Sequence, residues 1–410
     1  MSAIIRDIDR PENSHKINYI RIVTEKGTVY DITKLFTDLI IYEGIRDDSV
    51  EGSLTFVDEN DIMSTIPIIG REQLHISFTS RDDKGNFIEP PYEKVLSILS
   101  PDMLQRDKSV FRQIVTVNFV SSEFIKQSRI KVNRSFTASN SDIVTQLMTA
   151  LESSVQVEEC LHPRTVIAPN ITPFDFIHML ADESTSKTNE SCDFAFFENK
   201  DGYHFKSVYT LMQQEPVAVL NLDNRNVDDT YDRFTIHQYI VDRQFSSIDQ
   251  LDGILGQTAL THDIINKNII EHTATYYDLI TKFKTMNGGS LFVDDTQEQF
   301  LNSSESFGLA EGPYKEHSAN ENNQRIVRDF NRTLLDSYVA LAELPGNIDI
   351  KTGDVVDIDF KATDILDQHD YFRSGKHIVM KLKHALTPQT YMMTLELCKD
   401  SHKVIERQLS

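Results

Sequence analysis

The strongest constraint on the fold is a strict alternation of apolar and polar residues early in the chain. In the run GSLTF, Leu54 and Phe56 would share one face of a strand, with small polar residues on the other. A second run, LHISF, repeats the pattern with Leu74, Ile76 and Phe78. Alternation of period two is typical of a strand with one buried and one solvated face. The segment therefore predicts two half-buried strands above a hydrophobic core.

Length and composition indicate a globular protein with several cores. The chain has 410 residues, which at about 150 residues per domain suggests two to four domains. No run approaches the roughly 18 apolar residues of a membrane span, and the charged N-terminus lacks the apolar core of a signal peptide. Three widely spaced cysteines, Cys160, Cys192 and Cys398, argue against a disulfide framework. We therefore expect synthesis in a reducing cytoplasm, without membrane insertion.

The charge balance excludes one class of function. The formal net charge is −22, which repels phosphate backbones, and no cluster of Lys and Arg interleaved with aromatic residues interrupts it. Sequence-specific nucleic-acid binding is therefore not expected.

Residues 1–120 are predicted to form one antiparallel barrel or sandwich, since closure removes sheet edges. Besides the two strands above, Val115, Val117 and Phe119 alternate with polar residues, and a polar turn is expected at 82–86.

Residues 121–213 predict a separate α/β domain. Ser139 followed by Asp142, and Thr172 followed by Pro173 and Asp175, are typical helix starts. Two strand-like runs flank a Lys-Asp-Gly turn at 200–202, which indicates a hairpin.

The remainder predicts a second strand-rich domain, split between 214–246 and 319–400, with a tail at 401–410. Alternating runs occur at 234–241, 356–360 and 380–397, and one helix is expected between Val327 and Leu341. Residues 247–318 are interpreted as an inserted peripheral domain, in which the polar run 302–306 is expected to be an exposed loop.

The common catalytic signatures are absent. An acidic stretch from Asp223 through Arg225 and Asn226 to Asp228 does not match a Ca²⁺ loop, which requires Gly at its sixth position and Glu at its twelfth. A solvated turn is the better interpretation.

Three further groups of residues could carry chemistry but favour a simpler interpretation. Cys160 and His162 lack a third catalytic group. His262 and His272, with Glu271, lack a spacing that places two ligands on one helix face. The adjacent pairs Asp294 with Asp295 and Asp228 with Asp229 would usually point apart, whereas glycosidases need carboxyls that face each other. We therefore predict no catalytic, cofactor-binding or metal site.

The order of these segments resembles that of the baseplate hub proteins of contractile-tailed bacteriophages, from about residue 17 to 399. The resemblance begins with a strand, a short helix at 61–65 and a second strand within 40–78. It continues in five further segments: KVNRSFTASNSDIVTQLM (131–148), PNITPFDFIHMLADES (169–184), YHFKSVYTLMQQEP (203–216), IDIKTGDVVDIDF (348–360) and KHIVMKLKHALTPQTYMMTLELCKD (376–400). The inserted domain matches poorly.

The resemblance implies an α+β, mainly β fold with two tail-tube-like antiparallel β-barrels per chain, and a homotrimer whose six barrels form a ring. Such a structural virion protein would adapt the sixfold tail tube to a trimeric central spike or tail lysozyme protein, contact other baseplate proteins, and leave a channel for DNA. Two alternatives remain open: the spike base of a type VI secretion or bacteriocin particle, and a hub fused to a cell-wall hydrolase.

Overall fold

The computed structural model describes residues 15–58, 62, 68–82, 84–106, 113–161, 163–222, 233–246, 256–263, 267–289, 302–308, 315–360, 370 and 372–403. Several predicted features lie outside these residues: the short helix at 61–65 apart from Ile62, His162, the acidic stretch 223–229, the pair at 294–295, and most of the tail 401–410.

The first strand block is an antiparallel sheet of seven strands in the order β3-β4-β7-β6-β5-β1-β2. Its members are β1 (His15–Val23), β2 (Val29–Asp31), β3 (Phe36–Gly44), β4 (Glu51–Asp58), β5 (Gln73–Ser80), β6 (Tyr92–Arg106) and β7 (Gln113–Ser121). Leu54 and Phe56 on β4, and Leu74 and Ile76 on β5, are fully buried. The predicted alternation is confirmed on β4, whereas on β5 the polar residue Ser77 is buried as well, so that strand is not half solvated. The polar turn is confirmed, because Asp82 accepts backbone hydrogen bonds from residues 84 and 86.

The second strand block contains β13 (Ala218–Leu222), β14 (Gln238–Arg243), β18 (Val339–Pro345), β19 (Val355–Phe360), β20 (Gly375–Leu386) and β21 (Tyr391–Cys398). Its pairings run β14-β18-β21-β20-β19-β13. An isolated bridge between Asn221 and Thr235 also connects β13 to the segment that leads into β14. The β13–β19 pair is parallel, whereas the resemblance to hub proteins implied antiparallel barrels.

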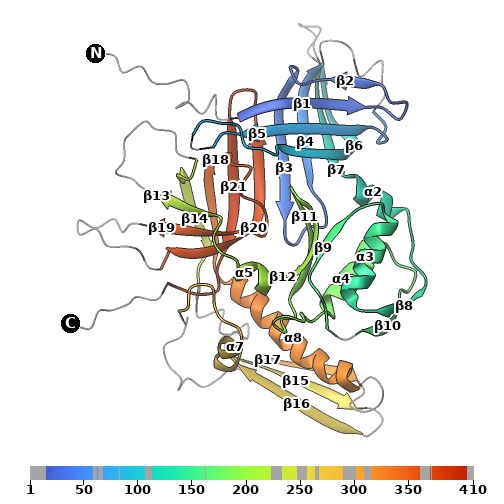
Figure 1. Ribbon diagram of the computed structural model, residues 1–410, viewed down its shortest axis with the longest axis vertical. Coiled ribbons are helices and arrows are strands. Elements are labelled where there is room, and N and C mark those ends of the chain that lie inside the picture. Colours follow the sequence, from blue (N-terminus) through green and yellow to red (C-terminus); the bar gives the residue numbers. More distant parts are fainter. Residues whose placement is uncertain are drawn as a thin grey trace, which may run out of the picture.

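The two blocks form one continuous sheet of 13 strands because β3 pairs antiparallel with β20. The register sets Leu39 opposite Leu386 and Gly44 opposite Lys381. In Figure 1 the long β20–β21 hairpin rises beside β3 and reaches the level of β1 and β5.

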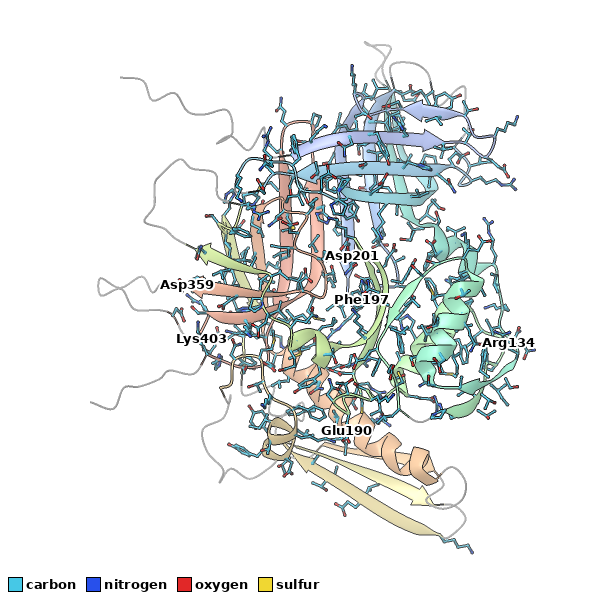
Figure 2. The ribbon with its side chains drawn as sticks, in the orientation of Figure 1. Arg134, Glu190, Phe197, Asp201, Asp359 and Lys403 are labelled. Atoms are coloured by element: carbon cyan, nitrogen blue, oxygen red, sulfur yellow. The ribbon has the colours of Figure 1, made fainter. Side chains whose placement is uncertain are left out.

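The middle module joins the two blocks along the chain. It contains α2 (Ser122–Ser128), β8 (Ser135–Ala138), α3 (Asn140–Ala150), β9 (Val155–Val157), β10 (Arg164–Ile167), α4 (Pro173–Asp182), β11 (Phe194–Asn199), β12 (Gly202–Ser207) and α5 (Val208–Met212). Ser139 caps α3 by accepting from the Asp142 backbone N–H at 3.2 Å, and Thr172 caps α4 in the same way. Both predicted helix starts and the predicted hairpin are therefore confirmed. In Figure 2 the labelled residues of this hairpin, Phe197 and Asp201, lie between the second strand block and the helices of the module.

The inserted sheet contains β15 (Gly256–Asp263), β16 (Asn268–Thr275) and β17 (Asn302–Gly308), with α7 (Tyr276–Lys282) and α8 (Lys315–Asp336) packed against it. The exposed loop predicted at 302–306 is wrong, because these residues form β17 and pair parallel with β15. The helix predicted to reach Leu341 ends at Asp336, and Leu341 belongs to β18.

Candidate functional site

Of the candidates for chemistry, Cys160, His262, Glu271 and His272 lie within the described residues. Cys160 is buried, and desolvation raises the pKa of its thiol to about 11, so the thiol stays protonated at neutral pH. A protonated thiol is a poor nucleophile. All three cysteines are free and buried.

The histidines of the inserted sheet lie apart. In the β15–β16 ladder, His262 is opposite Ile269 and His272 is opposite Ala259. These positions are three residues apart along the ladder, about 10 Å at strand spacing. Within the part of the chain that the structure describes, no group of three or more His, Cys, Asp or Glu side chains could hold a metal ion. In the same part, no helix is long and apolar enough to span a membrane.

One interior site of interest lies at the seam where β3 meets β20. Glu43 lies on β3 opposite Leu382 and is only 2% exposed. The Tyr92 hydroxyl donates a hydrogen bond to Glu43 Oε1 at 2.9 Å. Burial raises the pKa of Glu43 to about 7, while the nearby Lys94 ammonium acts in the opposite direction. The seam thus contains a carboxyl group that titrates near neutral pH.

Aromatic rings from both strand blocks pack around Tyr92, the partner of this carboxyl group. Phe78 stacks on Tyr92 with ring centroids 4.8 Å apart, and Tyr391 meets Phe78 edge-on at 5.6 Å. His384 Nδ1 lies 2.7 Å from the Tyr391 hydroxyl, and burial lowers the pKa of His384 to about 3, which keeps the ring neutral. Such aromatic pairs contribute about 0.5–1.5 kcal/mol each beyond their buried area.

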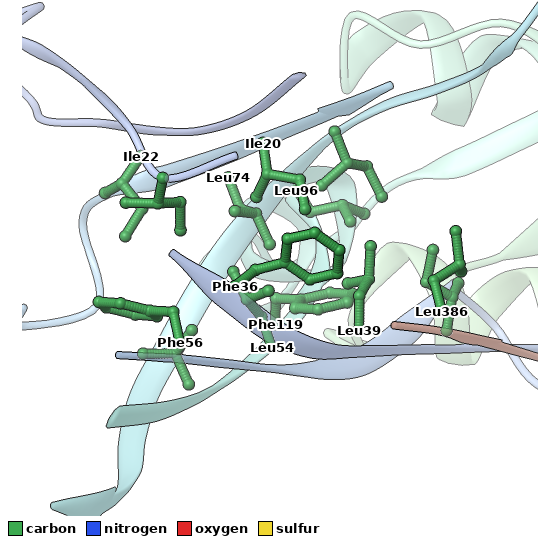
Figure 3. Packing of buried hydrophobic residues seen from close by; sticks show 14 of the residues in the cluster. Ile20, Ile22, Phe36, Leu39, Leu54, Phe56, Leu74, Leu96, Phe119 and Leu386 are labelled. Atoms are coloured by element: carbon green, nitrogen blue, oxygen red, sulfur yellow. The ribbon is translucent and has the colours of Figure 1, made fainter. Parts of the chain in front are cut away.

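The β20–β21 hairpin also completes the hydrophobic core of the first strand block. Leu386 and Tyr391 of the hairpin, together with Ile348 from the segment before β19, belong to the same buried cluster as Phe56 and Phe119. Figure 3 shows Leu386 beside Leu39 at one end of this cluster. The first block is therefore not an independent core, because residues from the far end of the chain close it.

Sequence reasoning missed the seam, although one signal was present. Leu39, Ile41 and Glu43 occupy the same phase of the β3 alternation, and all three are buried. An acidic residue in the apolar phase of a strand is costly to bury unless it has a partner. Tyr92 is that partner here, but nothing in the sequence indicated that it would be adjacent.

A cavity of about 370 Å³ lies between the middle module, α8 and the end of β3. Its wall combines apolar residues such as Phe196 and Met380 with the ion pair Arg46–Asp336, whose atoms are 2.6 Å apart. His178 also lines it and pairs with Asp48 at 2.5 Å, and that hydrogen bond raises the pKa of His178. Each of these charged side chains is already paired, so the cavity resembles a packing defect at an interdomain contact more than a ligand site.

Among the exposed apolar side chains of the described residues, some lie on each of the two strand blocks. One group, on the second strand block, is Val217, Val219 and Ile240, which are 46–51% exposed. The other, on the first block, is Ile69, Val95 and Leu99, which are 44–67% exposed. Figure 1 shows β13 and β14 on the opposite side of the molecule from β6. Apolar surface at two separate places is typical of a protein that contacts other chains.

No protein-family model matches the chain. The chain is 24% identical over 385 residues to the probable baseplate hub protein gp334 of Vibrio phage KVP40, with 89% of this chain and 90% of the phage protein covered. The chain is therefore similar over most of its length to a phage baseplate hub protein. The resemblance predicted from the sequence is confirmed.

Solved structures show the same fold over nearly the whole chain. A tail protein from Neisseria meningitidis MC58 matches with a TM-score of 0.56, 10% identity and coverage of 94% of this chain and 97% of the other. The 43 kDa tail protein of prophage MuSo2 from Shewanella oneidensis matches with a TM-score of 0.55, 10% identity and coverage of 93% and 98%. A chain of the Francisella PdpA–VgrG complex matches with a TM-score of 0.50 and 9% identity, covering 97% of this chain but 60% of that one. The mainly β fold is thus one that tail proteins share.

Proposed function

We propose that the chain is a structural hub of a contractile-tail baseplate and that three copies form a ring. In this proposal the two strand blocks are tail-tube-like barrels, so that three chains present six barrels to a sixfold tail tube and threefold symmetry to a trimeric spike or tail lysozyme protein. The hub would be assembled in the host cytoplasm, would stay in the virion tail with other baseplate proteins, and would perform no catalysis. Its similarity to a hub protein over 89% of its length supports this role.

The observation that carries the proposal is the β3–β20 pairing. Two blocks with different sequences lie side by side in one continuous sheet within a single chain. A ring of six barrels requires this type of contact at every junction, three times within chains and three times between them. The exposed apolar groups on β13–β14 and around β6 lie far apart, which suits a head-to-tail contact that closes into a ring.

A further part of the proposal concerns the channel. With a net charge of −22, we propose that acidic side chains line the central hole, because Lys and Arg contacts to phosphate would hold DNA that has to slide past. A ring structure with a lumen lined mainly by Lys and Arg would contradict this part and leave the trimer proposal intact.

The test is the oligomeric state of the purified chain. An obligate contact of this kind should bury roughly 2,000 Å² or more, so light scattering at micromolar concentration should give three times the 47.0 kDa of one chain. Negative-stain images should show a ring with a central hole and six lobes. A stable monomer, or a ring with only three equivalent lobes, would contradict the proposal.

Surface variants locate the contact. Val219→Asp on β13 and Val95→Asp on β6 place a charge in the proposed interface, so each should lower the trimer fraction without unfolding the chain. Ile167→Asp is the matched control, because Ile167 is 66% exposed but lies on β10 of the middle module. If all three variants remain trimeric, the contact lies elsewhere.

One alternative has a specific observation in its favour. The match to the PdpA–VgrG chain favours a spike-base component of a type VI secretion or bacteriocin particle, and this chain spans about three fifths of that protein. Binding assays with purified tail-tube protein and with a separate trimeric spike distinguish the two. A phage hub should bind both.

A further inference from the structure

The turn between β11 and β12 lies where three parts of the molecule meet. Residues 198–201 of this hairpin contact the first strand block, the second strand block and the rest of the middle module. Figure 2 shows Asp201 and Phe197 at this central position. Most loops of a globular protein run over its surface, so a turn with buried charges calls for an explanation.

The contacts with the first strand block are ionic and largely buried. Lys94 Nζ on β6 donates to Glu198 Oε1 at 2.6 Å and to the Asn199 carbonyl oxygen at 2.6 Å. Glu198 Oε2 accepts from the Val50 backbone N–H at 3.0 Å and from the Ser121 hydroxyl. The side chains of Lys94 and Glu198 are only 11% and 5% exposed.

The same turn binds the segment that leads into β19. Asn199 Nδ2 donates to the Thr352 carbonyl oxygen at 3.0 Å, and Lys351 Nζ donates to Asp201 Oδ2 at 2.6 Å. Lys200 Nζ contacts both blocks, at 3.0 Å from the Pro90 carbonyl oxygen and 3.5 Å from that of Ile348. Four consecutive residues thus connect β6, β7 and the entry to β19.

Buried ion pairs of this kind contribute to specificity more than to stability. Desolvation of two charges offsets most of their mutual attraction, so the correctly docked pair adds little net free energy. A rotated or undocked module would leave one charge buried without its partner, which is strongly unfavourable. The contact therefore penalises every orientation of the module except the observed one.

We propose that the β11–β12 turn is an orientation lock, in which the Lys94–Glu198 pair sets the angle between the first strand block and the middle module. The second contact, through Asn199 and Asp201, fixes the position of the second block relative to the same turn. The chain then carries its two blocks in a fixed relation before it meets other copies. This last consequence rests on the proposed ring, whereas the lock itself does not.

Pulsed electron paramagnetic resonance on the full chain tests the lock directly. The spin labels are attached at Lys84→Cys in the exposed polar turn of the first block and at Ile167→Cys in the middle module. The three native cysteines are buried and their pKa values are raised, so the introduced thiols label selectively. Labelled chains are diluted into unlabelled chains, which leaves only distances within one chain. The parent should give one narrow distance distribution.

Lys94→Met and Glu198→Gln should each broaden that distribution or add a second distance. Lys187→Met is the matched control, because Lys187 pairs with Glu159 at a similar 2.7 Å, but these side chains are 60% and 74% exposed. The control should leave the distribution unchanged. A narrow, unshifted distribution in folded Lys94→Met and Glu198→Gln would overturn the proposal.

The double variant Lys94→Met/Glu198→Gln tests the orientation lock even if neither single variant folds. It leaves no lone buried charge at this contact, so we expect it to fold and to keep a broad distribution; a narrow one would overturn the lock. Sedimentation of the same proteins separates the two proposals. If a tenth of the chains stay competent, each of the three chains in a trimer contributes a factor of about ten, so the apparent constant [monomer]³/[trimer] rises about 1,000-fold, which is about thirtyfold in the chain concentration needed for assembly. A parent that never forms trimers would contradict the ring, while its distance distributions would still report on the lock.

Discussion

Tyr92 on β6 donates a hydrogen bond to Glu43 on β3, beside the seam where β3 pairs with β20, with 2.9 Å between the oxygens. The second carboxyl oxygen of Glu43, Oε2, is buried and has no hydrogen-bond partner among the described residues. A buried carboxylate with one free oxygen favours the protonated form. The pKa of about 7 for Glu43 follows from this environment.

The first prediction is a loss of stability as the pH rises through the pKa of Glu43. Because the folded-state pKa is raised from 4.5 to about 7, the folded state binds more protons between these values than the unfolded state does. The contribution of Glu43 is therefore complete below about pH 4.5 and is lost as the pH approaches and passes 7, by about 3 kcal/mol at most. Urea unfolding at pH 5 and pH 8 measures it.

Glu43→Gln isolates this effect, since other buried groups also titrate. The amide oxygen can still accept from Tyr92 but carries no proton equilibrium, so the difference in unfolding free energy between pH 5 and pH 8 should shrink relative to the parent. Glu51→Gln, at an exposed position of β4, should leave it unchanged. An equal pH dependence in Glu43→Gln and the parent would rule out Glu43 as the source.

The second prediction concerns the far end of the same seam. Tyr391→Ala removes a fully buried ring that packs on Phe78 and His384, so we expect a loss of about 3–5 kcal/mol. Tyr391→Phe keeps the ring and removes only the hydroxyl that meets His384 Nδ1, for which about 1–2 kcal/mol is expected. Denaturant unfolding gives both values. Equal losses in the two variants would mean that the hydroxyl, not ring packing, dominates.

The third prediction tests the two block cores. Phe56→Asp and Ile358→Asp each place an unpaired charge at a fully buried position, at a cost of several kcal/mol. Both should abolish soluble folded chain and, with it, any ring. Ser53→Asp lies on the opposite face of β4 from Phe56 and should be tolerated. Circular dichroism and light scattering of the three variants provide the comparison, and a trimeric Phe56→Asp protein would contradict the core assignment.

The fourth prediction is that Cys160 has a packing role only. The buried, protonated thiol behaves as a small apolar group, so Cys160→Ala should keep the fold and the oligomeric state of the parent. Thermal unfolding and light scattering check both properties. A hydrolytic activity that is present in the parent and lost in folded Cys160→Ala would overturn the structural, non-enzymatic role.

Local rules in the sequence determined most of the individual elements. The strands at 54–56 and 74–78 follow from period-two alternation, because one face of each must avoid water. Helices α3 and α4 follow from Ser139 and Thr172, whose side chains satisfy backbone N–H groups only three residues away. In these cases the residues that stabilise the element are close together in the chain, so the sequence alone predicts the element.

Only the tertiary structure decided the rest. The polar residues of β17 have no alternating pattern of their own. They form a strand because they pair with the edge of β15, some 40 residues earlier in the chain. The helical spacing from Val327 continues to Leu341, yet the chain leaves the helix at Asp336 because β14 and β21 supply hydrogen bonds on both sides of β18. Glu43 is buried because Tyr92 and the β20–β21 hairpin meet it there. Such contacts join residues tens to hundreds of positions apart, and their energies depend on partners that no local pattern specifies.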